Sequence, residues 1–260
     1  MRNIAVVLAG GTGSRMGSTV PKQFMEVWGR AVIEYSIDTM NAHKAIDEVA
    51  VVVHKDWREE MERIAARNGW EKLTRIIEGG SERYMSTLNA VMAYIDEPDD
   101  TNLLLHDAAR PLVSADIVSR VVAALERSEA VGVAMPSTDT VWEVHPDVGC
   151  QMSEVRCGVP HFVARIPERR LMWRAQTPQG FRLPLLRDAY QRALQDTLFA
   201  ATDDCGVVRR YMPGVKIAVV EGEERNMKVT TPQDLEIINR IFNDECKKSF
   251  GSDGCEVGAV

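Results

Sequence analysis

A glycine-rich segment follows directly on the first apolar run of this chain. Residues 4–7 are apolar, and residues 8–24 then read LAGGTGSRMGSTVPKQF. Glycines let a chain turn tightly and let backbone N–H groups approach a ligand, and several such groups together bind anions. Arg15 and Lys22 place two positive charges in the same segment. The pattern therefore predicts a buried strand that opens into a loop binding the phosphates of a nucleotide.

The glycine spacing fits neither of two common phosphate-binding fingerprints. A dinucleotide fingerprint requires G-x-G-x-x-G, but Met16 stands at the third glycine position after Gly11 and Gly13. A Walker A motif requires glycine before its lysine, but Lys22 follows Pro21. A tight strand-to-helix turn with solvated cations stays open as an alternative.

Composition limits the classes of partner. The chain has 260 residues and a formal net charge of −7, so the positive field for a nucleotide must come from a few cations in one cleft, and nucleic acid is not an expected partner. Its five cysteines include no C-x-x-C pair, which favours free thiols in the cytoplasm over a disulfide framework or a zinc site. No apolar run approaches the roughly 18 residues of a membrane span, and we expect neither a span nor a signal peptide.

Apolar runs alternate with amphipathic segments along the chain. The runs predict buried strands at residues 4–9, 49–54, 74–77, 103–106 and 131–135. Helical spacing of apolar residues predicts helices at 33–40, 57–68, 83–94, 115–127 and 185–194. This alternation is typical of an α/β fold, a parallel sheet with helices on both faces, whose ligand lies at the carboxyl ends of the strands.

Residues 137–164 interrupt the alternation. Strand-like patterns at 140–144 and 162–164 predict an arm-like β excursion, with an ordinary surface hairpin as the alternative. A closing helix is expected at 232–242, with Pro232 at its first position after a capping threonine. The segment 247–260 is rich in Gly, Ser and charge, and we expect it to be a disordered tail.

Two polar motifs follow predicted strands. Asp107 and Arg110 lie in the sequence HDAARP after the strand at 103–106. An Asp at a strand end beside a phosphate loop suits Mg²⁺, and the guanidinium fork of Arg suits a phosphate. The alternative for Asp107 is a cap of the helix that begins near Ser114. Gly80 lies in EGGSER after the strand at 74–77, and Ser86 one turn into the next helix reaches the same region.

Three later residues complete the set. Thr177 lies in RAQTPQGF, which we expect to form a rigid loop that presents polar groups to a polyol. Thr202 precedes a predicted helix and either caps it or contacts a phosphate. Lys228 lies in a strand-like apolar segment, where a lysine either serves as a functional cation or extends its amine to solvent.

Together these motifs resemble those of the cytidylyltransferases that make CDP-linked polyols, among them the 2-C-methyl-D-erythritol 4-phosphate and ribitol 5-phosphate enzymes. The resemblance covers residues 3–243. It implies a single domain over 1–243 with a Rossmann-like three-layer α/β sandwich, a mostly parallel sheet and a β arm at about 137–164 that builds a homodimer.

The resemblance assigns a role to each candidate residue by matching position. Arg15, Lys22 and Lys228 would stabilise the transition state, and Asp107 would bind Mg²⁺. The nucleotide would be bound by Leu8, Ala9, Gly10, Gly11, Gly13, Gly80, Arg83 and Ser86. The polyol phosphate would be bound by Asp107, Arg110, Thr177 and Thr202, and by Thr140 and Arg169 from the arm of the partner subunit.

Details of the pattern bear on the acceptor. The erythritol-type enzymes begin the first loop with P-A-A-G, where this chain has L-A-G-G, and they usually have Asp where Arg225 stands. Residues 166–169, 202–205 and 230–232 are more similar to the ribitol enzymes. We therefore expect CTP and D-ribitol 5-phosphate as substrates, giving CDP-ribitol and pyrophosphate. 2-C-Methyl-D-erythritol 4-phosphate is the alternative acceptor. An NAD(P)-dependent oxidoreductase and a non-catalytic nucleotide-binding protein are more distant alternatives.

Overall fold

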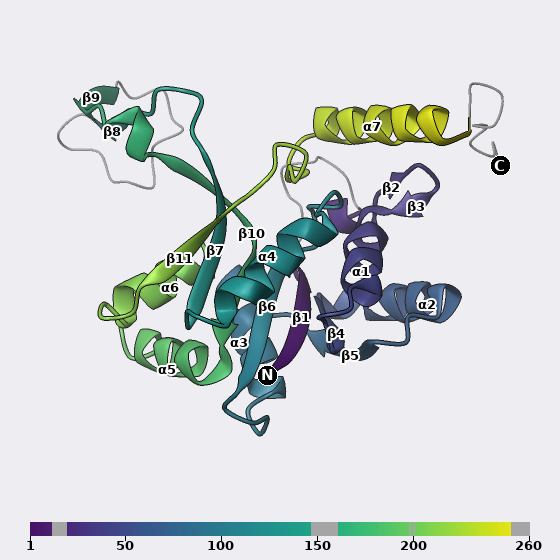
Figure 1. The fold of residues 1–260 in the computed structure, drawn as a ribbon, viewed down its shortest axis with the longest axis horizontal. Coiled ribbons are helices and arrows are strands. Elements are labelled where there is room, and N and C mark those ends of the chain that lie inside the picture. The colour runs from purple at the N-terminus through teal and green to yellow at the C-terminus, as the bar shows by residue number, and fades with distance from the viewer. Residues whose placement is uncertain (12–19, 147–160, 198, 200, 251–260) are drawn as a thin grey trace.

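A seven-stranded sheet forms the centre of the computed structural model (Figure 1), which describes residues 1–11, 20–146, 161–197, 199 and 201–250. In sheet order the strands are β11 (Ile217–Glu221), β7 (Ala130–Pro136), β10 (Trp173–Arg182), β6 (Thr101–Asp107), β1 (Arg2–Ala9), β4 (Glu48–Val53) and β5 (Leu73–Glu78). All neighbouring pairs are parallel except those that β10 forms with β6 and β7. The predicted α/β fold with a mostly parallel sheet is confirmed.

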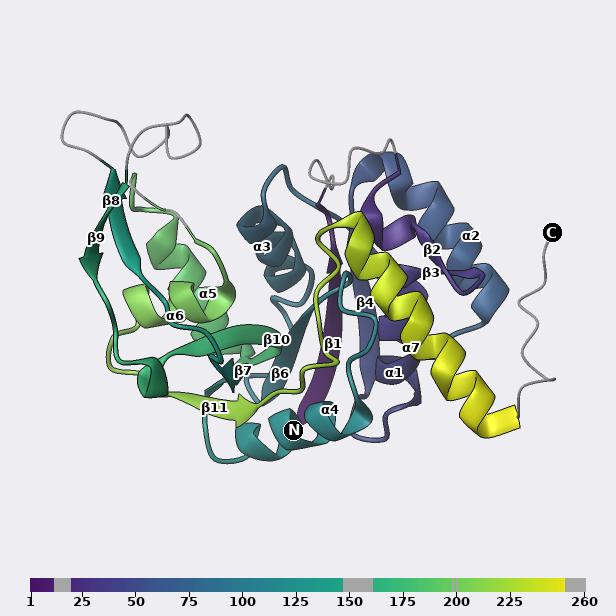
Figure 2. The ribbon, with the colours of Figure 1, turned by 90° about the horizontal axis from the view of Figure 1, so that it is seen from above.

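Helices cover both faces of this sheet. The helices are α1 (Val32–Ala42), α2 (Arg58–Asn68), α3 (Arg83–Ala93), α4 (Ala115–Leu125), α5 (Leu183–Ala193), α6 (Asp204–Tyr211) and α7 (Pro232–Phe250). Buried residues of α1, α2 and α4 form one core with the sheet, and those of α3, α5 and α6 form a second. Figure 2 shows α3 and α1 on opposite sides of β1. Because β1, β4 and β6 are covered on both faces, nearly all their residues are buried and most are apolar.

The segment expected to be a rigid loop at 174–181 is instead most of β10. This strand pairs antiparallel with both neighbours, and its ladder to β7 is irregular between Gln176 and Gln179. Its polar residues and its proline obscured the strand pattern in the sequence. They are accommodated because this irregularity interrupts the regular ladder at that point.

The predicted excursion forms a two-stranded antiparallel arm of β8 (Glu143–Pro146) and β9 (His161–Arg165), which projects from the sheet in Figure 1. The first arm strand begins later than the expected 140–144. The closing helix α7 begins at Pro232 as predicted but continues to Phe250, so its expected end at 242 was too early. It includes residues 247–250 of the expected tail, and residues 251–260 lie outside the described ones. None of the described helices is long and apolar enough to cross a membrane.

Helix caps exclude two of the alternatives. The Ser114 hydroxyl accepts the N–H of Ile117 and caps α4, so Asp107 is not that cap. The Asp203 carboxylate accepts the N–H of Gly206 at 2.8 Å and caps α6, so Thr202 does not.

A buried carboxylate ties strands together at the amino end of β4. Glu48 is 4% exposed, and it accepts hydrogen bonds from Thr74 and from the Tyr94 hydroxyl at 2.7 Å. It also pairs with Arg2 and Arg75. Burial by itself would raise the pKa of Glu48, but these hydrogen bonds and cations outweigh it and lower that pKa.

We predict that Glu48→Gln lowers the free energy of unfolding at pH 7 by about 1–3 kcal/mol, because charge-assisted hydrogen bonds are lost in a buried site. A lowered folded-state pKa stabilises the fold above the unfolded value of 4.5, and this stability is lost as the pH falls through the folded value. The gap between wild type and Glu48→Gln should therefore shrink on acidification below pH 4.5. Urea unfolding at several pH values measures it, with the exposed Glu71→Gln as control. A gap that is absent, or equally large at low pH, contradicts the assignment.

Candidate active site

The carboxyl ends of the central strands bring together the segments that the sequence singled out. β1 ends at Ala9, where the glycine-rich segment begins, and Leu8 pairs with Asp107 at the end of β6. The backbone N–H of Val229 donates to Ala109 at 2.8 Å, which brings the segment before α7 to the same place. In Figure 2, α3 and the beginning of α7 lie on either side of this end of β1.

Asp107 lies among three cations. Its carboxylate accepts a hydrogen bond from Lys228 Nζ at 2.6 Å, and it lies 3.6 Å from Arg83 Nε and 3.9 Å from Arg110 Nε. Burial would raise the pKa of Asp107, but the charges of Lys228, Arg83 and Arg110 hold that pKa well below its usual range. The site therefore holds an ionised carboxylate and an excess of positive charge, which suits a polyanionic ligand.

Arg83 is held by a second carboxylate. Its guanidinium lies 2.8 Å from Asp204 Oδ2, and Asp204 has no exposed surface. The Tyr190 hydroxyl donates to Asp204 Oδ1 at 2.6 Å, and burial with this carboxylate raises the pKa of Tyr190. The backbone N–H of Asp204 donates to Gln179 Oε1 at 3.1 Å. These contacts fix Arg83 of α3 between the end of β6 and the start of α6.

Arg110 is oriented by the segment that carries Lys228. Its Nη1 donates to the backbone oxygen of Asn226 at 2.7 Å. The Asn226 side chain has no exposed surface, and it donates to the Thr177 oxygen at 2.9 Å and to Gln176 Oε1 at 3.1 Å. Asn226 thus joins β10 to the segment before α7 and fixes the Arg110 fork.

A hydrogen-bonded chain aligns Thr177 with the end of β6. The N–H of Asp107 donates to Thr177 Oγ1 at 3.1 Å, and Thr177 Oγ1 lies 3.0 Å from His106 Nδ1. His106 Nε2 lies 3.2 Å from the Arg110 carbonyl oxygen, so it carries the proton and the Thr177 hydroxyl donates to Nδ1. Burial lowers the pKa of His106 to about 4. The neutral imidazole therefore links the Thr177 hydroxyl to the Arg110 carbonyl oxygen.

Two side chains of the PKQF sequence form hydrogen bonds with distant backbone groups. Gln23, 3% exposed, donates from Nε2 to the backbone oxygens of Ala9 at 2.7 Å and of Gly11 at 2.8 Å. Lys22 Nζ donates to the Val229 oxygen at 2.8 Å. The turn Lys22–Phe24 and the segment before α7 are therefore in direct contact.

Gly10 packs against the loop that follows β5. The N–H of Gly80 donates to Ser86 Oγ at 3.2 Å. A Cβ atom on Gly10 would lie 2.5 Å from that oxygen and 3.7 Å from the Cα of Gly79. A side chain at position 10 therefore requires the Ser86 hydroxyl to rotate away or the loops to shift.

The structure brings together most of the candidate residues that it describes. Those at the carboxyl ends of the strands are Leu8, Ala9, Gly10, Gly11, Lys22, Gly80, Arg83, Ser86, Asp107, Arg110, Thr177 and Lys228. Gly13 and Arg15 lie outside the described residues. Thr140 and Arg169 are exposed near the base of the arm, where Arg169 Nη1 donates to the Thr138 oxygen at 3.4 Å, and Thr202 is exposed just before α6.

Sequence reasoning missed three residues that hold this site. Gln23, Asp204 and Asn226 are buried and polar. Each lies inside a motif that the sequence indicated, in PKQF, in TDD and beside Lys228, but their partners are far away along the chain. Buried polar side chains require such partners, and the sequence does not name them.

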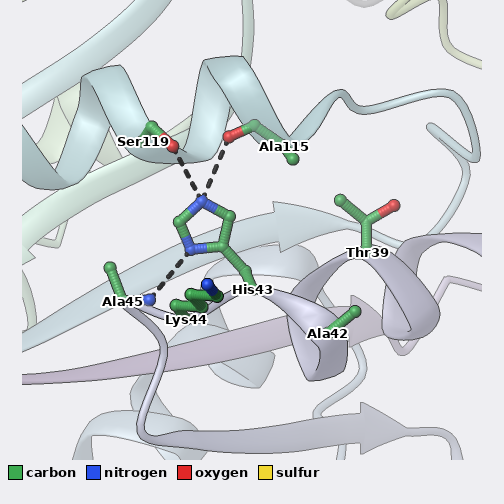
Figure 3. A pocket seen from close by; sticks show the side chains of 7 residues that line it. All are labelled: Thr39, Ala42, His43, Lys44, Ala45, Ala115 and Ser119. Atoms are coloured by element: carbon green, nitrogen blue, oxygen red, sulfur yellow. Dashed lines mark hydrogen bonds between the residues drawn. The ribbon is translucent and has the colours of Figure 1, made fainter.

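A separate hollow lies between α1 and α4 (Figure 3), and none of its lining residues is a candidate residue. His43 in this hollow accepts the N–H of Ala45 at Nδ1, and its Nε2 lies 2.9 Å from Ser119 Oγ and 3.1 Å from the Ala115 oxygen. Both imidazole nitrogens thus have partners, and Nε2 joins the end of α1 to α4. Burial lowers the pKa of His43.

Comparison with known proteins gives a consistent result. The model of a protein family described as 2-C-methyl-D-erythritol 4-phosphate cytidylyltransferase (IspD) matches residues 3–244. A 2-C-methyl-D-erythritol 4-phosphate cytidylyltransferase of Thermobifida fusca is 45% identical over 241 residues, 93% of each chain. A bifunctional ribulose 5-phosphate reductase/CDP-ribitol pyrophosphorylase of Haemophilus influenzae is 38% identical over 241 residues, 93% of this chain and 48% of that protein. The crystal structure of 4-diphosphocytidyl-2C-methyl-D-erythritol synthase from Anaerococcus prevotii matches with a TM-score of 0.78 and 28% identity, covering 93% of this chain and 96% of that one.

We predict that Gly10→Ala lowers the free energy of unfolding by about 1–3 kcal/mol, as overpacking does, because the new Cβ meets Ser86 Oγ. Ser86→Ala in the same chain removes that oxygen and should restore part of the loss. Thermal and urea unfolding of the two single variants and the double variant measure the coupling. Gly11→Ala is the control, because a Cβ there meets none of the described residues within 4 Å. Strictly additive effects would show that the two loops do not meet as described.

Proposed function

We propose that this chain, which belongs to the family of 2-C-methyl-D-erythritol 4-phosphate cytidylyltransferases, transfers CMP from CTP to 2-C-methyl-D-erythritol 4-phosphate and releases pyrophosphate. Membership in the family makes it a nucleotidyltransferase, not an oxidoreductase or a non-catalytic binding protein. The identity of the acceptor is inferred from the relatives and the substrates in their names. The T. fusca protein named for this substrate is 45% identical, whereas the relative named for CDP-ribitol is 38% identical and twice as long as the match. This favours the alternative acceptor over the D-ribitol 5-phosphate that we expected from the sequence.

The observation that carries the proposed chemistry is the group of cations around Asp107. In the reaction an oxygen of the acceptor phosphate forms a bond to the α-phosphorus of CTP, and the bond to the pyrophosphate oxygen breaks with its electron pair leaving on pyrophosphate. The acceptor phosphate is already ionised, so no general base is required. The main obstacle is repulsion between two anions, and fixed cations reduce it most where charge develops.

We assign Lys22 and Lys228 to the phosphates of CTP, together with Arg15, whose position the structure does not describe. Lys228 donates to Asp107 and Lys22 to the Val229 oxygen, so each ammonium is already held near the place where the phosphates would lie. Arg110, with its fork fixed by Asn226, and Thr177 would orient the acceptor phosphate for in-line attack. Thr202 before α6 would contact the same phosphate.

Asp107 is the residue that we propose for Mg²⁺. Its carboxylate is ionised at neutral pH because three cations lower its pKa, and Mg²⁺ prefers such oxygen ligands. Among the described residues, no three His, Cys, Asp or Glu side chains gather as an all-protein metal site requires. The residues therefore fit an ion held jointly by Asp107 and the phosphates of the substrate. Such an ion supplies neutralising charge to those phosphates.

The base of CTP would lie over the glycines of the first loop and of the loop after β5. Gly10 and Gly80 are both partly exposed, and Ser86 Oγ lies close to both. Arg83 at the start of α3 would contact the nucleotide from the same side, fixed by Asp204.

The acceptor is tested by pyrophosphate release from CTP with a panel of polyol phosphates. We predict that kcat/KM for 2-C-methyl-D-erythritol 4-phosphate exceeds that for D-ribitol 5-phosphate on the order of 10²-fold, because the hydroxyl groups and methyl branch of the correct acceptor fit polar and apolar contacts that a pentitol cannot all satisfy. A reaction without acceptor is the control. A preference for D-ribitol 5-phosphate would overturn the proposed acceptor but leave the cytidylyltransferase assignment standing.

We further propose a homodimer in which the arm of one subunit completes the site of the other. Exposed apolar residues cluster on and beside the arm, among them Trp142, Phe162 and Ile166, and a second copy would cover them. In a single chain, Arg169 contacts Thr138 of its own arm base. In the proposed dimer, Arg169 would instead bind the acceptor phosphate in the site of the partner subunit.

We predict that inactive Arg169→Ala mixed with inactive Lys22→Ala regains activity, because one site of each mixed dimer has both residues. Turnover is measured after subunit exchange, and each variant alone is the control. Mixtures that exchange subunits but stay inactive contradict a shared site, and a monomer at micromolar concentration in sedimentation contradicts the dimer.

A further inference from the structure

The two lysines assigned to the phosphates lie on segments from opposite ends of the chain. Lys22 lies in the short helical turn Lys22–Phe24, which leads directly into the β2–β3 hairpin (Glu26–Val27 and Arg30–Ala31). Lys228 lies just before α7. The link that the site itself provides is the hydrogen bond from Lys22 Nζ to the Val229 oxygen. Figures 1 and 2 both show α7 lying along the hairpin, so a second link exists outside the site.

This second link centres on Trp28 at the tip of the hairpin. Its backbone N–H donates to Asn239 Oδ1 at 3.0 Å, and its indole Nε1 donates to Asn243 Oδ1 at 2.7 Å. The two asparagines are four residues apart, so they lie on one face of α7. We call Trp28, Asn239 and Asn243 the hairpin clasp.

The backbone of Trp28 shows that the clasp is a specific contact. Trp28 has a φ of 53°, in the left-handed region that residues other than glycine rarely adopt. Gly29 follows it at φ 75°. A bulky residue remains in this conformation only when its surroundings hold it there, and the bond to Asn239 holds the N–H that this turn presents to α7.

A small apolar cluster connects the clasp to the site. Phe242 of α7 stacks on Tyr35 with ring centroids 4.5 Å apart. The buried members of the cluster come from the hairpin, α1, the loop after β6, the segment before α7 and α7 itself: Val27, Val32, Ala109, Leu112, Val229 and Ile238. Ala109 and Val229 are also joined by a backbone hydrogen bond. A shift of α7 against the hairpin therefore reaches Val229, and through it both lysines.

From these contacts we propose that the hairpin clasp positions Lys22 and Lys228 relative to each other for the reaction. Trp28, Asn239 and Asn243 are positioning residues that touch no substrate. The expected loss of kcat rests on the proposed function, because the two lysines act together only in the proposed phosphoryl transfer. Its structural part, the coupling of the clasp to residues 228–230, is independent of that function.

The kinetic test removes one clasp bond at a time. Trp28→Phe keeps an aromatic ring but loses the indole N–H, Asn243→Leu loses the acceptor, and Asn243→Asp keeps an acceptor oxygen. We expect the first two to lower kcat about tenfold or more, because small displacements of catalytic groups have effects of that size. KM for CTP and for the acceptor should stay close to wild type. Asn243→Asp should retain most of the activity, as should the control Arg240→Leu, an exposed change on the same helix.

A second measurement does not depend on turnover. Amide hydrogen exchange followed by mass spectrometry should show faster exchange at residues 228–230 in Trp28→Phe and Asn243→Leu, where the Val229 N–H bonds to Ala109, and unchanged exchange in β1 and β6. Unchanged kcat in both variants, or unchanged exchange at 228–230, overturns the proposal. If the wild-type protein turns over no acceptor at all, the proposed function fails, and the exchange result still decides whether the clasp holds this segment.

Discussion

The ionised carboxylate of Asp107 is the constraint on which the rest of the site depends. A carboxylate taken out of water is strongly unfavourable unless charges and hydrogen bonds compensate for it. Here Lys228, Arg83 and Arg110 provide that compensation. Three cations gathered at one place also repel one another, and the negative charge of Asp107 offsets part of that repulsion.

Two of these cations, and Lys22 near them, are each held by a further contact from a different part of the fold. Arg83 pairs with buried Asp204 at the start of α6, and Arg110 donates to the backbone of Asn226. Lys22 is joined to the segment of Lys228 through Val229. The parallel sheet makes this convergence feasible, because strands that run in the same direction end at the same edge and deliver their loops there. The charges are therefore preorganised, and little rearrangement is needed when phosphates arrive.

The most buried strands were the easiest to predict from the sequence. β1, β4 and β6 are covered on both faces, so each contains an apolar run that predicted it. The helices between them showed helical spacing of their apolar residues. β10 was missed because it carries Gln176, Thr177 and Gln179, whose partners come from other elements. The length of α7 was underestimated because its polar second half does not show the apolar stripe of its first turns.

The site was predictable to the extent that its chemistry lies in local motifs. The glycine-rich segment and HDAARP each placed charged or flexible residues at a strand end, and the structure brings together those of them that it describes. Gln23, Asn226 and Asp204 were beyond such reasoning, since a buried amide or carboxylate is explained only by its distant partners. Thr140 and Arg169 are exposed near the base of the arm, and a sequence motif does not state which subunit such a residue would serve.

The most direct test of the central role of Asp107 is calorimetric titration of CTP into the wild-type protein and into Asp107→Asn, each with Mg²⁺ and with chelator. The account predicts that Mg²⁺ strengthens CTP binding to the wild-type protein about tenfold or more. In Asp107→Asn this gain should be lost, and binding in chelator should be at least as tight as in the wild type, because Lys228, Arg83 and Arg110 no longer pair with a carboxylate. An equal gain from Mg²⁺ in both proteins would contradict the account.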